Sequence, residues 1–134
     1  MTRKELSQLY YLKREIANDE QRLAELESAA TATTSKASGL PGSGKRSDKT
    51  AIAAEIADLR SIINAKCEMC VAHYNKIMRY IAGIDDSFMR QIITYRCVDL
   101  LKWRQIAQRI GGGNTEEGVR KAYARFVDQL EENA

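Results

Sequence analysis

Residues 9–26 read LYYLKREIANDEQRLAEL, and their heptad pattern indicates an α-helical fold. Its apolar side chains are spaced by 3, 4, 7 and 3 positions, as in a heptad seam: Leu9, Leu12, Ile16, Leu23 and Leu26. Asp19 fills the remaining seam position. A single helix with so narrow an apolar stripe is marginal in water and needs a partner helix. We therefore expect a first coiled-coil helix over residues 1–29.

The heptad register resumes after residue 48 and continues for 36 residues. Its seam positions are, in order, Ile52, Ile56, Leu59, Ile63, Lys66, Cys70, His73, Ile77, Tyr80 and Ile84. Ser47 or Asp48 is the expected N-cap, and Gly83 is the expected stop. We expect a second coiled-coil helix over residues 49–83. Two such helices in one chain predict a long antiparallel coiled-coil hairpin.

Between these helices, residues 30–48 are rich in Thr, Ser, Gly, Ala and Lys and contain the one proline of the chain, Pro41. This composition predicts a flexible linker. The segment from Gly39 to Lys45 also matches G-x-x-x-x-G-K. Arg46 stands where a nucleotide site needs Ser or Thr for magnesium, and no strand precedes the segment, so we favour the linker.

Composition agrees with an all-α fold. Helix-forming residues dominate the 134 residues, and one proline is too few for the many turns of an all-β fold. No apolar run reaches the roughly 18 residues of a membrane span, and the N-terminus does not resemble a signal peptide. Three cysteines without such a signal favour a reduced, cytoplasmic protein that contacts no membrane.

A different pattern begins at residue 84 and predicts three short helices. An N-cap is expected among Asp85, Asp86 and Ser87. The first helix spans about 88–98 and the second about 102–110, and a third starts near Thr115. Their expected apolar faces are Met89, Ile92, Ile93 and Tyr95; Trp103, Ile106, Ala107 and Ile110; and Val119, Tyr123 (or Ala122), Phe126 and Leu130.

Three glycines at 111–113 separate the second helix from the third and permit a sharp turn. Asn114 or Thr115 is the expected cap of the third helix, and Asn114 with Glu117 fits a capping box that has Asn in the first position. Ala107 is small, which permits a close helix crossing. Three short helices with this break predict a helix-turn-helix module over residues 84–134.

Charge separates this module from the rest of the chain. Between Met89 and Arg125 there are eight basic and three acidic residues, a net charge of 8 − 3 = +5, whereas the whole chain carries +3. Such a surface favours a polyanionic partner, because basic side chains displace counterions from phosphates. Double-stranded DNA is therefore the expected partner, and a solvated face on an ordinary three-helix module is the alternative.

The segment LLKWRQIAQRIG (Leu100–Gly111) resembles the first helix of a sigma-70 region 4-like helix-turn-helix, and Val119-Arg120-Lys121 resembles part of its recognition helix. The turn at 111–115 is about two residues longer than in that group. The layout of the whole chain resembles a family of small proteins from phages and prophages of Firmicutes, first described as DUF1492. This resemblance implies a phage or prophage transcriptional regulator of the sigma-like or late-gene activator type.

On this reading, the helix from about 115 enters the major groove. The expected base contacts are Glu116, Glu117, Arg120 and Lys121, since Arg bonds guanine and Glu accepts from the cytosine amino group. The expected backbone contacts are Arg104, Arg109, Asn114, Thr115 and Arg125. One module makes a small interface, so we also expect contact with RNA polymerase or homo-oligomerisation through the coiled coil.

A metal site and an enzyme are less favoured. Cys67, Cys70 and His73 lie at i, i+3 and i+6 of one helix and cannot all face one point, and a fourth ligand has to come from Cys97 on another helix. Cys67 and Cys70 lie mid-helix, which does not suit a redox pair. The single histidine has no visible catalytic partners. We therefore expect no metal, no cofactor and no enzymatic activity.

Two other functions fit the same pattern. A non-enzymatic interaction module would act through the coiled-coil hairpin, with RNA polymerase or a phage protein as its partner. A small-terminase-like DNA packaging protein also joins a helix-turn-helix to an assembly region. The basic module favours the regulator and the packaging protein, whereas the heptads fit all three.

Overall fold

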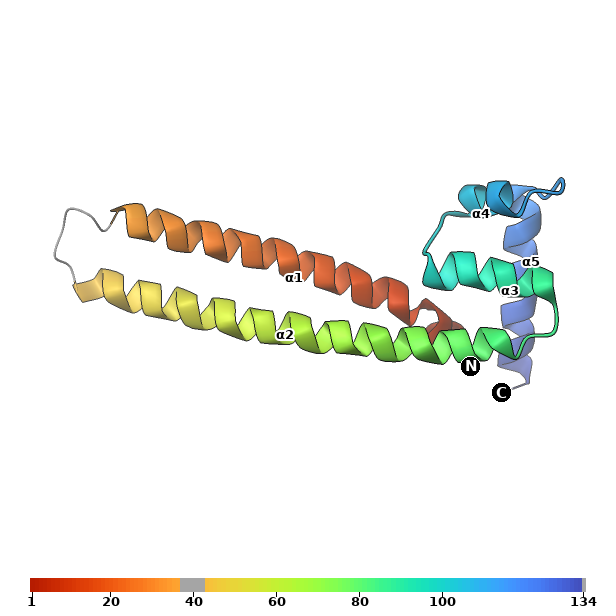
Figure 1. Cartoon of the computed structure of the whole chain (residues 1–134), viewed down its shortest axis with the longest axis horizontal. Helices are drawn as coiled ribbons and strands as arrows, with labels where there is room; N and C mark the ends of the chain where they lie inside the picture. Colours follow the sequence, from red (N-terminus) through yellow and green to blue (C-terminus); the bar gives the residue numbers. More distant parts are fainter. Residues whose placement is uncertain (37–42, 134) are drawn as a thin grey trace. The chain divides into compact units, whose positions relative to one another are not determined.

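A computed structural model describes residues 1–36 and 43–133, with side chains placed for 1–32 and 49–133. The described residues contain no strand, which confirms the predicted all-α class. The elements are α1 (Arg3–Lys36), α2 (Ser43–Ala82), α3 (Ser87–Ile93), a π-helix (Thr94–Val98), α4 (Trp103–Ile110) and α5 (Glu116–Glu132) (Figure 1).

The chain divides into two compact units. We call Met1–Leu12 together with the residues from Cys70 onward the core unit, and Lys13–Met69 the paired-helix unit. The region 84–134 is not a compact unit by itself, because the first turns of α1 and the last turns of α2 share its hydrophobic core.

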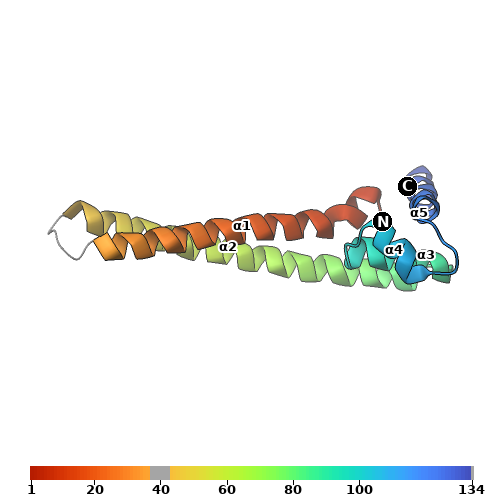
Figure 2. The same ribbon diagram turned by 90° about the horizontal axis from the view of Figure 1, so that it is seen from above.

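In the paired-helix unit, α1 and α2 lie side by side and run in opposite directions (Figures 1 and 2). The expected seam positions are the least exposed ones: Leu59 and Ile63 are buried, and Ile16, Leu23, Leu26, Ile52 and Ile56 are half-buried. Lys66 and Asp19, both at seam positions, form an ion pair of 2.5 Å between Nζ and Oδ2. The apolar seam and this pair together fix which turns of the two helices meet.

Both long helices extend into the predicted linker. Helix α1 continues to Lys36, past the expected end at Ala29, and α2 begins at Ser43, before the expected start at Lys49. Ser47 and Asp48 therefore lie inside α2 and are not its cap. The alanines at 29, 30 and 32 have the highest helix propensity, which the linker interpretation underrated. Pro41 lies outside the described residues.

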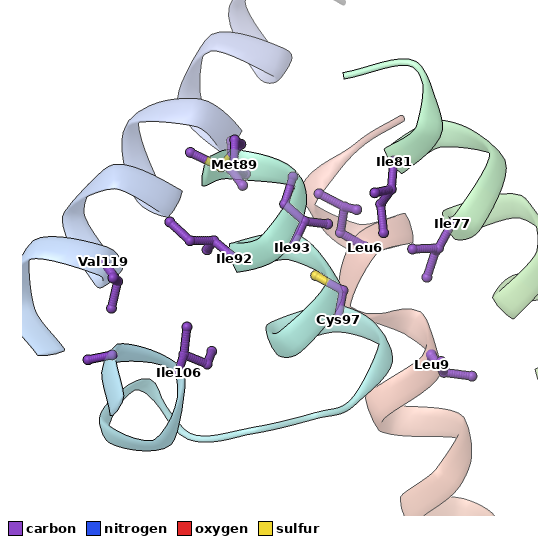
Figure 3. Close-up of a cluster of buried hydrophobic side chains, with 12 residues drawn as sticks. Leu6, Leu9, Ile77, Ile81, Met89, Ile92, Ile93, Cys97, Ile106 and Val119 are labelled. Carbon is purple, nitrogen blue, oxygen red and sulfur yellow. The ribbon is translucent and has the colours of Figure 1, made fainter. Parts of the chain in front are cut away.

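The core unit collects its apolar side chains from all six elements. Leu6, Ile92, Ile93, Ile106, Val119 and Val127 are 0% exposed. Figure 3 shows Leu6 of α1 beside Ile93 of α3, with Ile77 and Ile81 of α2 on the other side of Leu6. Helix α1 starts with a reciprocal capping box, in which the Thr2 amide donates to Glu5 Oε2 (2.8 Å) and the Glu5 amide donates to Thr2 Oγ1 (3.1 Å).

Helix α2 ends at Ala82, and the Gly83 amide donates to the Tyr80 carbonyl at 3.1 Å, as expected for a stop at Gly83. Asp86 is the N-cap of α3, since its Oδ1 accepts from the Phe88 amide at 3.0 Å. The helix expected over 88–98 is two elements, because the backbone changes from α to π geometry at Thr94. The π-helix ends before Leu100, a non-glycine residue with φ of 58°.

Candidate nucleic-acid interface

Helices α3, α4 and α5 turn their apolar sides toward one core. Ile92 of α3, Ile106 of α4 and Val119 of α5 are each 0% exposed, and Figure 3 shows them converging. Ala107 of α4 is also buried. The charged sides of α4 and α5 are therefore left to solvent.

The connection between α4 and α5 depends on glycine. Gly111, Gly112 and Gly113 have φ values of +66°, +64° and +80°. Residues that have a side chain rarely adopt positive φ angles, because their Cβ atom then collides with the backbone. The Gly111 carbonyl accepts from the Asn114 amide (3.2 Å) and from Asn114 Nδ2 (2.8 Å). The turn is thus closed by Asn114, which leaves its side-chain nitrogen engaged within the chain.

Thr115 caps α5, because its Oγ1 accepts from the Gly118 amide at 3.0 Å. The capping box expected between Asn114 and Glu117 is therefore wrong. Asn114 bonds back to the glycine turn, and the cap lies one residue later. A Cβ atom at Gly118 would lie 3.0 Å from Thr115 Oγ1, so the tight cap accommodates glycine best at this position.

All nine residues predicted to contact DNA have exposed side chains. They are Arg104 and Arg109 on α4, Asn114 and Thr115 in the turn, and Glu116, Glu117, Arg120, Lys121 and Arg125 on α5. The four predicted base contacts thus share the first two turns of one helix. The predicted backbone contacts flank them in the chain on both sides.

The cations of this region differ in what surrounds them. Lys121 Nζ lies 3.1 Å from Glu117 Oε1, and both side chains are more than 60% exposed. The Arg109 guanidinium lies 5.8 Å from the centre of the Tyr95 ring. Among the described residues, Arg120 and Arg125 make no ion pair. These two arginines therefore present their full charge to solvent.

Two of the eight basic residues counted between Met89 and Arg125 form contacts that stabilise the fold. Arg90 Nη1 donates to the carbonyls of Ile84 (2.6 Å) and Asp85 (2.9 Å), which closes the α2–α3 connection. Arg96 donates to the Leu101 carbonyl at 3.1 Å and lies 4.3 Å from the centre of the Trp103 ring. The net charge of +5 therefore overstates the charge that faces solvent.

Sequence reasoning missed the contacts that hold α5 in place. The rings of Trp103 and Tyr123 lie 5.2 Å apart, and the Tyr123 hydroxyl lies 3.6 Å from Cys97 Sγ. Burial raises the pKa of both Tyr123 and Cys97, so both stay neutral near pH 7. At the other end of α5, Arg3 forms an ion pair with Asp128 at 2.5 Å. The helix expected over residues 1–29 includes Arg3, but no local pattern predicts its contact with Asp128, because the two residues are 125 positions apart.

The cysteines and the histidine lie in different surroundings. Cys67 is exposed, Cys70 and His73 are half-buried, and Cys97 is buried against Tyr123. Within residues 1–36 and 43–133, no three His, Cys, Asp or Glu side chains come together as ligands for a metal ion. Of the G-x-x-x-x-G-K segment, residues 39–42 lie outside the described residues and 43–45 belong to α2.

Comparison of the chain with protein-family models, with curated proteins and with solved structures gives no match. None of the helices in the described part of the chain has the length and apolar character needed to cross a membrane.

Proposed function

We propose that this protein is a double-stranded-DNA-binding transcriptional regulator of phage or prophage type. In this proposal α4, the glycine turn and α5 form a helix-turn-helix, and α5 enters the major groove. The observation that carries the proposal is the separation of faces in this region. The apolar sides of α4 and α5 are buried in the core, and all nine candidate contact residues are exposed.

Each residue type has a chemical role in this proposal. Arg120 donates two parallel hydrogen bonds to guanine, and Glu116 accepts from the cytosine amino group. Arg104, Arg109 and Arg125 contact phosphates, which positions the module without reading sequence. The Asn114 amide and the Thr115 hydroxyl oxygen already form hydrogen bonds within the turn and the cap. Each side chain therefore offers a phosphate only the N–H or O–H donor that these bonds leave unused.

In the same proposal α1 and α2 form an antiparallel coiled-coil hairpin. The half-buried heptad positions and the ion pairs between the helices support it, with Arg60 bound to Glu27 at 2.8 Å and Lys66 to Glu15 at 3.3 Å. The hairpin supplies an assembly surface for a second copy of the chain or for RNA polymerase, since one helix-turn-helix buries too little surface for high affinity.

An interaction module without DNA binding is the second candidate. The exposed apolar side chains on α2 favour it: Val71 is 60%, Tyr74 43% and Met78 37% exposed, at a helical spacing of 3 and 4. Exposed apolar side chains on one helix face are typical of protein-binding surfaces.

Charge reversal distinguishes the two candidates. The double variant R120E/K121E is compared with K13E/R22E, which changes the net charge equally on exposed residues of α1. Binding to random and phage-derived duplexes is followed by fluorescence anisotropy over a salt series. The proposal expects the α5 variant to lose binding and its salt dependence, and the control to keep both. Equal binding by both variants, with helicity unchanged by circular dichroism, would refute it.

A further inference from the structure

The cations on the exposed side of α5 are not equivalent. Lys121 has a carboxylate partner one turn earlier, Glu117, at 3.1 Å. Arg120 and Arg125 have no ion pair among the described residues. The pair runs from acid to base in the direction of the helix, at i and i+4, which is the favourable orientation.

The pair lies at a particular place on α5. Thr115 fixes the first turn through its bond to the Gly118 amide, so the backbone beneath Glu117 is ordered before any partner binds. Val119 is 0% exposed, so the opposite side of α5 is held in the core. Glu117 and Lys121 are 66% and 61% exposed. Both side chains are therefore presented together on the side of α5 that is left to solvent.

We infer that Glu117 is a specificity-determining residue, which holds Lys121 as an internal counterion and so suppresses sequence-independent binding to DNA. This inference rests on the proposed function. A DNA phosphate must displace the Glu117 carboxylate before it can bind Lys121, and a carboxylate beside the backbone of DNA is itself repelled. A base pair that offers a hydrogen-bond donor to Glu117 removes both penalties, because the base donates to the carboxylate, which then releases the Lys121 ammonium group.

The consequence for salt dependence is quantitative. Each phosphate that a protein neutralises contributes about 0.9 to the slope of log binding constant against log salt concentration. If Glu117 keeps Lys121 from the phosphates in non-specific complexes, then removing its charge adds about one phosphate contact, and the slope steepens by about 0.9. At low salt the same variant binds random duplex DNA several-fold more tightly.

The test compares Glu117→Gln with Glu132→Gln on random duplex DNA. Glu132 lies on the same helix, is exposed and has no ion pair among the described residues, so its variant makes the same charge change away from Lys121. Glutamine keeps the length of the side chain and leaves the Thr115 cap intact. We expect E117Q to bind more tightly with the steeper slope, and E132Q to match the unmodified chain.

A double-mutant cycle separates the ion pair from a general charge effect. In a Lys121→Gln background, E117Q should no longer steepen the slope, because the cation that it releases is gone. The inference is overturned if E117Q still steepens the salt slope in the Lys121→Gln background. It is also overturned if the E117Q and E132Q slopes are equal.

The failure of the inference is distinguishable from failure of the proposed function. Salt-dependent binding by the unmodified chain without any effect of E117Q overturns only the role of Glu117. Absence of binding by both the unmodified chain and E117Q at low salt overturns the DNA-binding function and the inference with it. Binding by E117Q alone supports both.

Discussion

At the scale of single residues, the glycine turn shows how backbone geometry limits the sequence. A Cβ atom at Gly111 or Gly113 would meet nothing within 4 Å, and one at Gly112 would meet only Asn114 Nδ2 at 3.8 Å. Space is therefore available at all three positions. The restriction to glycine comes from the positive φ angles alone.

Gly112→Ala is accordingly expected to destabilise the core unit by about 1 kcal/mol, the cost of a left-handed residue with a side chain. Gly83→Ala is the matched control, because φ at Gly83 is not positive and its Cβ atom would lie 3.5 Å from the Tyr80 carbonyl, an ordinary contact. Urea denaturation followed by circular dichroism measures both. Equal loss of stability in the two variants contradicts the argument.

Glu5 links local capping to the pH dependence of stability. Its hydrogen bonds with Lys76 and with the Thr2 amide lower the pKa of its carboxyl from 4.5 to about 2. A depressed carboxyl pKa stabilises the folded chain above pH 4.5, and this stabilisation is lost as the pH falls from 4.5 through about 2.

Glu5→Gln should therefore lower stability at pH 7, where the unmodified chain has the Glu5 carboxylate, and should change it little at pH 2, where most of that stabilisation is already lost. Urea midpoints measured at intervals from pH 2 to pH 7 give the two curves. Curves that stay parallel over this range argue against a folded-state role for the Glu5 carboxylate.

At the scale of elements, the pairing of α1 and α2 places an ion pair, Asp19 with Lys66, at positions of the apolar seam itself. The side chains of Asp19 and Lys66 are 14% and 24% exposed. Their hydrogen bond raises the pKa of Lys66, so the ammonium form persists. Polar pairs at seam positions select register at some cost in stability relative to apolar residues.

Lys66→Leu is expected to lower the thermal midpoint, since it leaves Asp19 at the seam without its cation. The double variant D19L/K66L should recover the midpoint of the unmodified chain or exceed it, because two leucines pack along the seam. Differential scanning calorimetry provides the midpoints. A double variant less stable than K66L would exclude this account of the pair.

At the scale of the whole molecule, the core unit joins segments from both ends of the described chain. Arg3 and Asp128 form an ion pair although they are 125 residues apart, and the Arg3 amide donates to Glu131 at 2.8 Å. Leu6 and Leu9 are 0% and 1% exposed in the same cluster as Ile92 and Ile93. The start of α1 is thus a structural part of the unit that contains α5.

A fragment of residues 84–134 should consequently fail to unfold cooperatively, because it lacks the long helices that cover Ile92 and Ile93. A rearranged chain in which residues 70–134 are followed by a short Gly/Ser linker and residues 1–12 should restore a cooperative transition. The contact of Arg3 with Asp128 makes this connection short. Heat capacity scans compare the two fragments, and cooperative unfolding of the shorter one refutes the role of α1.

Local patterns predicted much of this structure. The heptads identified Leu9, Leu12, Leu59, Ile63 and Ile77, all buried, and every candidate DNA contact is exposed. The sequence did not reveal that Leu6 belongs to the same core as Ile93, because that contact depends on how distant segments meet. Nor did it distinguish Thr115 from Asn114 as the cap, since both side chains are good acceptors and the backbone of the glycine turn decides between them.

The ion pair between Arg3 and Asp128 also has a consequence for folding during translation. The first turns of α1 emerge from the ribosome long before α5 does, so their apolar side chains have no core to enter at that stage. Contacts between such distant segments form slowly, because a long loop must close first. A nascent chain of this protein therefore has no intact core unit, and the candidate contact residues on α4 and α5 are not yet held together, until α5 has been synthesised.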